Sequence, residues 1–138
     1  MQDEEETWCA AQRDQLIAYL GRQQLVHGQV GEWPAWHVYP HLAVWAIESV
    51  RQPGWVGWWA ISGDCPTDYV ECGPERTPRE AMRDIGMRWR EAAQSWALGK
   101  SVGNSIIGDQ EEWARIAPLL EARATMLLTW AADDRIWK

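Results

Sequence analysis

Residues 41–62 read HLAVWAIESVRQPGWVGWWAIS, and no other stretch says more about the architecture of this chain. Two apolar runs of strand length, residues 41–50 and 55–62, flank a segment that ends in Pro53-Gly54. Pro and Gly in the second and third places of a turn are typical of a chain reversal, so we expect a β-hairpin here. Both runs are apolar at odd and even positions, which indicates that both faces of the strands are buried.

The sequence on either side predicts further elements. Residues 3–27 begin with an acidic turn and carry an imperfect apolar face, so we expect a helix that His27-Gly28 ends. Residues 28–40 contain several glycine and proline residues and are expected to form an ordered loop rich in aromatic side chains. Residues 69–72 are expected to add a short third strand to the hairpin.

The clearest helix start lies at residues 77–80, which read TPRE. Thr77 suits the N-cap, Pro78 suits the first helical position, and Glu80 completes a capping box. Apolar residues follow at helical spacing, and Gly99 is expected to end the helix.

A last helix is expected to follow a loop rich in glycine and serine at residues 99–108, with Asp109 as its cap and an end near Asp134. Pro118 lies inside it and should kink the helix or split it in two. The order helix, strands, helix, helix predicts an α+β fold, in which a small antiparallel sheet packs with three to four helices. We expect residues 1–138 to form a single domain.

Charge and cysteine usage narrow the classes of partner. The formal net charge of −7 works against binding to nucleic acid or to anionic membranes, and it suits a basic protein partner or simply solubility. No apolar run is long enough to span a membrane, and the acidic N-terminus does not resemble an export signal. Three cysteines at scattered spacings suit reduced thiols, so we expect a cytoplasmic protein.

The composition has one anomaly, since the chain holds 12 tryptophans and no phenylalanine. A single core of this size has difficulty enclosing that many indole rings, so we expect several at or near the surface. Exposed tryptophan is enriched in the hot spots of protein interfaces. Two plainer explanations stay open: most of the rings belong to the core, or a homo-oligomer hides them in its own interface.

Four phrases carry a resemblance to a known family. They are GEWPAWHV, VWAIES, PGWVGWWAISGDCPTDYV and TPREAMRDIGMRW, and in this order and spacing the chain resembles the bacterial family of unknown function DUF4826. The resemblance covers nearly the whole chain, but Thr77 stands where a histidine is expected before the Pro-Arg pair. It implies a compact domain in which the loop at residues 61–70 meets the helix at residues 77–90, and it implies no substrate.

The loop at residues 61–70 reads ISGDCPTDYV and permits two interpretations. In the simpler one, Asp68 accepts backbone N–H groups in the turn and pairs with Arg79 or Arg83. In the functional one, a polar cluster at the open end of the sheet binds a ligand or a basic side chain of a partner. That cluster comprises Asp64, Thr67, Asp68, Tyr69 and Arg79.

No catalytic or metal-binding motif stands out. Cys65 would need a nearby base to act as a nucleophile, and nothing in the spacing brings a histidine to it. His37 and His41 have metal-ligand spacing only on a helix, which Pro40 forbids. We therefore expect no metal and no cofactor, assign no catalytic residue, and leave open whether the protein is an enzyme.

Two classes of function remain. The first is a protein-binding module whose tryptophan-rich surface and carboxylate loop grip a partner, for example an immunity protein that neutralises a basic toxin. The second is a small-molecule or enzymatic site with Asp64, Asp68 and Arg79 as its polar ends and a pocket walled by indole rings. The rings expected in that wall are Trp36, Trp45, Trp58 and Trp59.

Overall fold

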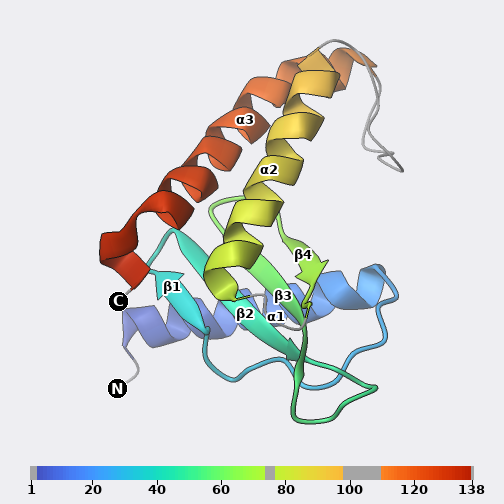
Figure 1. Cartoon of the computed structure of the whole chain (residues 1–138), viewed down its shortest axis with the longest axis vertical. Coiled ribbons are helices and arrows are strands. Elements are labelled where there is room, and N and C mark those ends of the chain that lie inside the picture. Colours follow the sequence, from blue (N-terminus) through green and yellow to red (C-terminus); the bar gives the residue numbers. More distant parts are fainter. Residues whose placement is uncertain (1–2, 74–76, 98–109, 138) are drawn as a thin grey trace. The chain divides into compact units, whose positions relative to one another are not determined.

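The computed structural model describes residues 3–73, 77–97 and 110–137. In chain order these residues form α1 (Glu4–Arg22), β1 (Trp36–Val38), β2 (Leu42–Glu48), β3 (Val56–Gly63), β4 (Asp68–Glu71), α2 (Pro78–Ala97), α3 (Gln110–Ala132) and the 3₁₀ helix η1 (Asp134–Trp137) (Figure 1). The predicted α+β class is confirmed. The chain divides into two compact units, unit 1 (Met1–Ala81) and unit 2 (Met82–Lys138), and each is described by itself.

The central hairpin of unit 1 is confirmed. β2 and β3 pair antiparallel from Leu42 opposite Gly63 to Glu48 opposite Val56, with an irregularity after Ile47. The turn between them closes with a hydrogen bond of 3.0 Å from the Trp55 N–H to the Gln52 carbonyl oxygen. Gly54 has a φ of 89°, which the third place of a type II turn requires and which glycine adopts without strain.

The sheet has four strands in the order β1-β2-β3-β4, all antiparallel. The predicted third strand is β4, shifted by one residue. The expectation that residues 28–40 form only a loop is wrong, because Trp36–Val38 pairs with β2 as β1 and Val30 forms a bridge to Ile47. A three-residue strand has no local periodicity of its own, and its pairing is decided by the strand beside it.

The first helix ends five residues earlier than predicted, at Arg22 instead of His27. Gln24 has a φ of 58°, its N–H bonds to the Gly21 carbonyl, and the Leu25 N–H bonds to the Leu20 carbonyl. This is the hydrogen-bond pattern of a Schellman motif. Glycine usually occupies the left-handed position of that motif, so a glutamine there gives no stop signal in the sequence.

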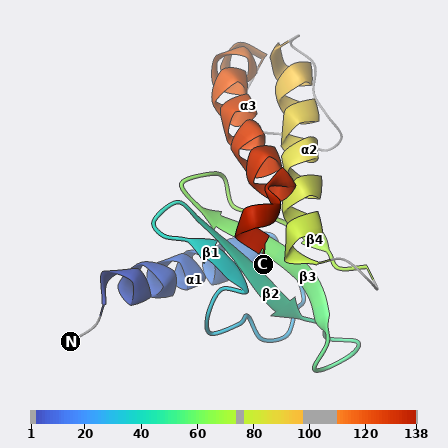
Figure 2. The same cartoon turned by 60° about the vertical axis from the view of Figure 1, so that its left-hand side comes forward.

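The core of unit 1 lies between α1 and one face of the sheet. Leu16 and Leu20 of α1 pack there against Trp45, Ile47 and Ala60, together with Val30 and Ala43. Figures 1 and 2 both show α1 lying across the sheet. The side chains that alternate with these along the hairpin are also buried, as the continuous apolar runs predict. They include Leu42, Val44 and Ile61.

The start of α2 follows the predicted capping box. The Thr77 hydroxyl accepts from the Glu80 N–H at 3.2 Å, and the Glu80 carboxylate accepts from the Thr77 N–H at 3.0 Å. α2 runs to Ala97. The predicted stop at Gly99, the loop at residues 99–108 and the Asp109 cap lie outside the described residues.

In unit 2, α2 and α3 run side by side (Figures 1 and 2). A Cβ on Gly86 would lie 3.0 Å from the Leu128 side chain and 3.1 Å from that of Leu127, so the absence of a side chain there permits the close approach of the helices. α3 is continuous through Pro118 and is not split. It ends at Ala132, two residues before the expected end.

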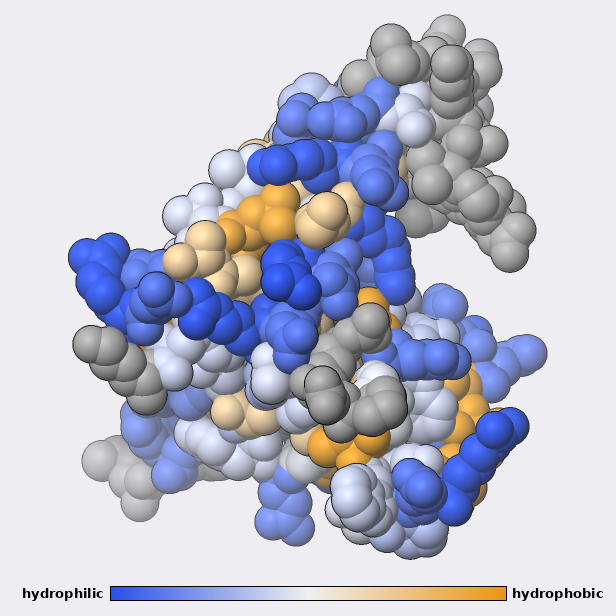
Figure 3. Space-filling view, in the orientation of Figure 1, coloured by the Kyte–Doolittle hydropathy of each residue, from blue (hydrophilic) through white to orange (hydrophobic). Residues whose placement is uncertain are grey.

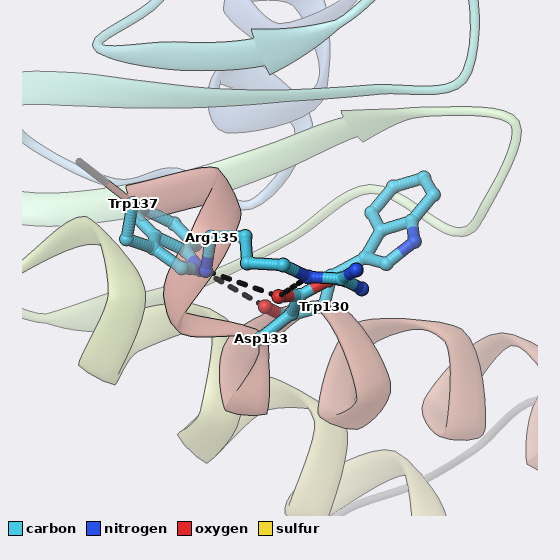
Figure 4. A network of polar contacts seen from close by, with 4 residues as sticks. All are labelled: Trp130, Asp133, Arg135 and Trp137. Carbon is cyan, nitrogen blue, oxygen red and sulfur yellow. Dashed lines mark hydrogen bonds and ion pairs between the residues drawn. The ribbon is translucent and has the colours of Figure 1, made fainter.

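Four residues close the end of α3 (Figure 4). The Trp137 indole N–H donates to the Trp130 carbonyl oxygen at 2.9 Å, which satisfies one of the carbonyl groups that a helix end exposes. The Arg135 guanidinium donates to both carboxylate oxygens of Asp133, at 2.9 and 3.0 Å. Because the Arg135 side chain is 86% exposed, this ion pair adds little stability.

Candidate functional site

The loop at residues 61–70 is tied down at both ends. Gly63 ends β3 with a φ of 135°, and the Asp64 N–H donates to the His41 carbonyl oxygen at 2.8 Å. Asp68 begins β4, where its Oδ1 accepts from the Tyr69 N–H at 2.8 Å. Asp68 therefore makes the kind of local bond that the simpler interpretation of the loop predicts. The Asp64 side chain is exposed and that of Thr67 is half-buried.

The aromatic residues predicted for one site are spread over both faces of the sheet. Trp58 packs against the core on the α1 face, as does Tyr69, whose ring centroid lies 6.2 Å from that of Tyr19. Trp59 follows Trp58 in β3, so its side chain lies on the opposite face, where it is buried. One pocket cannot take both rings.

The remaining predicted residues do not complete a pocket either. Trp45 is fully buried, and its indole N–H donates to the Ser62 hydroxyl at 3.0 Å. Trp36 is half-buried in β1 opposite Val44, at the other end of the sheet order from β4. Arg79 is half-buried in the first turn of α2, and its pairing with Asp68 stays a prediction.

A cleft of about 590 Å³ lies instead at the turn end of the hairpin, and we call it the hairpin cleft. Three segments of unit 1 line it: the chain just after α1, the hairpin turn together with the start of β3, and the end of β4. Its walls include Val26, Val50, Arg51, Trp58 and Glu71. Trp58 is the one predicted site residue among those that line it.

Large apolar side chains are exposed around the hairpin cleft. Val26 is 74% exposed, Val50 is 49% exposed, and Trp55, next to the lining residue Val56, is 69% exposed. Figure 3 shows hydrophobic atoms at this end of unit 1, where the chain after α1 meets the hairpin. Gathered apolar side chains on a surface mark interaction sites, whereas scattered ones need no explanation.

The turn end of the hairpin is held by the carboxylate of Glu48. Its Oε1 accepts from the Gln29 N–H at 3.1 Å and its Oε2 from the Gly54 N–H at 2.8 Å. These backbone hydrogen bonds, first that from Gln29 and then that from Gly54, lower the pKa of Glu48. The Glu48 side chain thereby fixes the hairpin turn to the chain after α1. Both of these segments line the cleft.

We predict that Glu48→Gln destabilises the protein at pH 7 and that the difference from the wild type narrows in acid. A carboxylate whose pKa is lowered on folding contributes stability above its ordinary pKa of 4.5, and this contribution is lost as the pH falls through the lowered value. Urea denaturation of both proteins between pH 7 and pH 3 measures the difference. A difference that stays constant over this range would contradict the role of the charged form.

Cys72 and Cys9 lie in different surroundings. Cys72 lines the hairpin cleft, and its thiol donates to the Gly73 carbonyl oxygen at 3.2 Å. Burial, and then the nearby Glu5 carboxylate, raise the pKa of the Cys9 thiol, which is 1% exposed. A thiol of this kind is unreactive.

Three further findings concern metal ligands, disulfides and membrane-spanning helices. Over residues 3–73, 77–97 and 110–137, no three His, Cys, Asp or Glu side chains are grouped so that they could hold a metal ion. Cys9, Cys65 and Cys72 all lie in these ranges, and the structure joins none of them in a disulfide. Among the described helices, none combines the length and hydropathy that crossing a bilayer requires.

The comparison with protein families matched nearly the whole chain. A family model described as "Domain of unknown function (DUF4826)" matches residues 2–137, which is nearly the whole chain. No curated protein and no solved structure matches the chain significantly.

Proposed function

Because the chain belongs to the family described as a domain of unknown function (DUF4826), which names no activity, we propose a function from the geometry of unit 1. We propose that the protein is a non-enzymatic binding module whose hairpin cleft docks another protein. The exposed apolar side chains of Val26, Val50 and Trp55 around the cleft carry this proposal. Tryptophan and arginine are both enriched in interface hot spots, and Trp55 and the lining residue Arg51 are of these types.

Charge supports a basic partner. Residues 1–81 hold 12 of the 20 acidic residues and five of the 13 basic ones, whereas residues 82–138 hold eight of each. The formal net charge of −7 therefore belongs entirely to unit 1. A field of one sign speeds encounter with a partner of the opposite sign, and added salt weakens that effect.

In its most specific form, the proposal is an immunity-type inhibitor that binds a basic toxin. Such a protein works by tight binding alone, which agrees with a cleft that is already formed in the chain by itself. We place the protein in the cytoplasm, because thiols that form no disulfide suit a reducing compartment.

Small-molecule binding is a second candidate, favoured by the size of the hairpin cleft. Its volume of about 590 Å³ lies within the range of roughly 300–1,000 Å³ that ligand pockets occupy. Trp58 in the cleft wall would report such a ligand through a change in its fluorescence. A metabolite that changes this fluorescence, and that displaces no protein partner, would favour the second candidate.

We predict that Trp55→Ser weakens binding to the protein partner by about 10-fold or more, because losing a hot-spot ring costs a large share of the binding energy. The matched control is Leu119→Ser in α3, since Leu119 is 68% exposed but belongs to unit 2. Tagged wild type and both variants are used to capture the partner from the source cell, and its dissociation is then measured at two salt concentrations. Size-exclusion chromatography of each protein alone separates this outcome from self-association.

An equal loss in both variants would contradict a role for the hairpin cleft. If the wild type eluted as a dimer and Trp55→Ser as a monomer, the apolar surface would be the interface of a homo-oligomer.

A further inference from the structure

Unit 1 has a second surface that contributes nothing to the hairpin cleft. It has three contacts, two of which join the start of α1 to the chain at residues 33–39, while the third lies within that chain. The ring centroids of Trp8 and Tyr39 lie 5.7 Å apart and those of Trp33 and His37 lie 5.3 Å apart, both nearly perpendicular. The His37 Nε2 lies 2.6 Å from the Glu5 Oε1. We call these five residues the aromatic face.

The rings of the aromatic face are fixed yet accessible. Trp33 is 48% exposed and Tyr39 is 39% exposed, although each has an aromatic neighbour that limits its motion. Glu5 and Trp8 are three residues apart on α1, so they lie on the same side of the helix and bring the two ring pairs together. Rings held in this way lose little conformational entropy when a partner binds.

The surroundings of the aromatic face are acidic. Exposed carboxylates flank it at the N-cap Asp3 and at Glu4 and Glu6 of α1, and Glu32 precedes Trp33. The Arg13 guanidinium donates to the carbonyl oxygens of Val30 and Gly31 at 3.0 Å each. The positive charge of Arg13 is thus paired with backbone carbonyl oxygens that precede Trp33 in the chain.

We propose that the aromatic face binds arginine side chains of a basic protein segment. Cations are attracted to the faces of indole and phenol rings, and nearby carboxylates strengthen the attraction. A purely apolar partner would have to remove water from the flanking carboxylates without pairing them, which is costly. Arginine fits better than lysine because the planar guanidinium stacks on aromatic rings and is more weakly hydrated.

This inference extends the proposed function, because the arginines would belong to the basic partner, but its test does not use that partner. The probe is a hexa-arginine peptide, compared with hexa-lysine and titrated calorimetrically into the full chain. The double variant Trp33→Leu/Tyr39→Leu keeps apolar side chains while removing both accessible rings. Leu119→Ser is the control, because Leu119 is 68% exposed and belongs to unit 2, outside both the aromatic face and the hairpin cleft.

We expect the wild type and Leu119→Ser to bind hexa-arginine alike, and the double variant to bind it about 5- to 30-fold more weakly. The indole N–H signals of Trp8 and Trp33 should shift in NMR spectra on titration, and hexa-lysine should bind more weakly than hexa-arginine. Thermal melting checks that the double variant is folded.

If the double variant bound hexa-arginine as tightly as the wild type does, the binding would be general charge attraction and the inference would be overturned. The inference would also be overturned if the wild type did not bind hexa-arginine. The two proposals can fail separately. In one case Trp55→Ser loses the partner, but the double variant binds hexa-arginine as tightly as the wild type does. That result would support the hairpin cleft and contradict this inference. In the opposite case Trp55→Ser keeps the partner, but the double variant binds hexa-arginine more weakly. That result would contradict the role of the hairpin cleft and support the role of the aromatic face.

Discussion

Gly63→Ala is expected to destabilise the protein by about 3 kcal/mol or more, because this position is strained for any side chain in two independent ways. Its φ of 135° is a conformation that residues with a Cβ rarely adopt. A Cβ would also lie 2.4 Å from the carbonyl oxygen of His41 and 2.9 Å from the Cα of Leu42. Both atoms belong to the backbone, so no side chain can turn away to make room.

Gly54→Ala separates the two causes of strain. Gly54 also has a positive φ, 89°, but nothing lies within 4 Å of where its Cβ would be. This variant should cost about 1–2 kcal/mol, from the backbone conformation alone. Urea denaturation followed by circular dichroism measures both variants. If Gly63→Ala cost no more than Gly54→Ala, the close approach of β3 to the start of β2 would be wrong.

Elements with a strong local signal were predictable from the sequence. The Pro53-Gly54 turn and the capping box at Thr77 act within four residues, so the sequence alone shows them. The end of α1 was missed because Gln24 takes a left-handed conformation that glycine usually takes. β1 was missed because three residues between two prolines form a strand only through pairing with β2.

The candidate site was harder to predict than the fold. The loop at residues 61–70 attracted attention because its polar residues are adjacent in sequence, whereas the hairpin cleft is assembled from three separate segments. Trp58 and Trp59 look equivalent in the sequence, but the alternation of a strand sends them to opposite faces. One sequence signal could have directed attention to the cleft: Val50 and Trp55 are apolar residues that flank a turn expected to be exposed.

Trp45→Ala is expected to cost about 3–5 kcal/mol, the range for deleting a large aromatic side chain from a packed core. Trp45 is 0% exposed and belongs to the cluster that α1 and the sheet share. Trp55→Ala removes the same side chain from a site that is 69% exposed, so it should stay within about 0.5 kcal/mol of the wild type. This small effect, measured by urea denaturation, would show that a change at Trp55 tests binding without unfolding the protein.

The hydrogen bond of Trp45 can be separated from its volume. The indole N–H and the Ser62 hydroxyl, both fully buried, bond to each other at 3.0 Å. Ser62→Ala leaves the N–H unpaired, and Trp45→Phe leaves the hydroxyl unpaired, so each should cost about 1–3 kcal/mol. The double variant leaves neither group, so it should cost less than the sum of the single variants by about 0.5–3 kcal/mol. Strictly additive losses in urea denaturation would show that the two groups do not depend on each other, and that Trp45 stabilises unit 1 by packing alone.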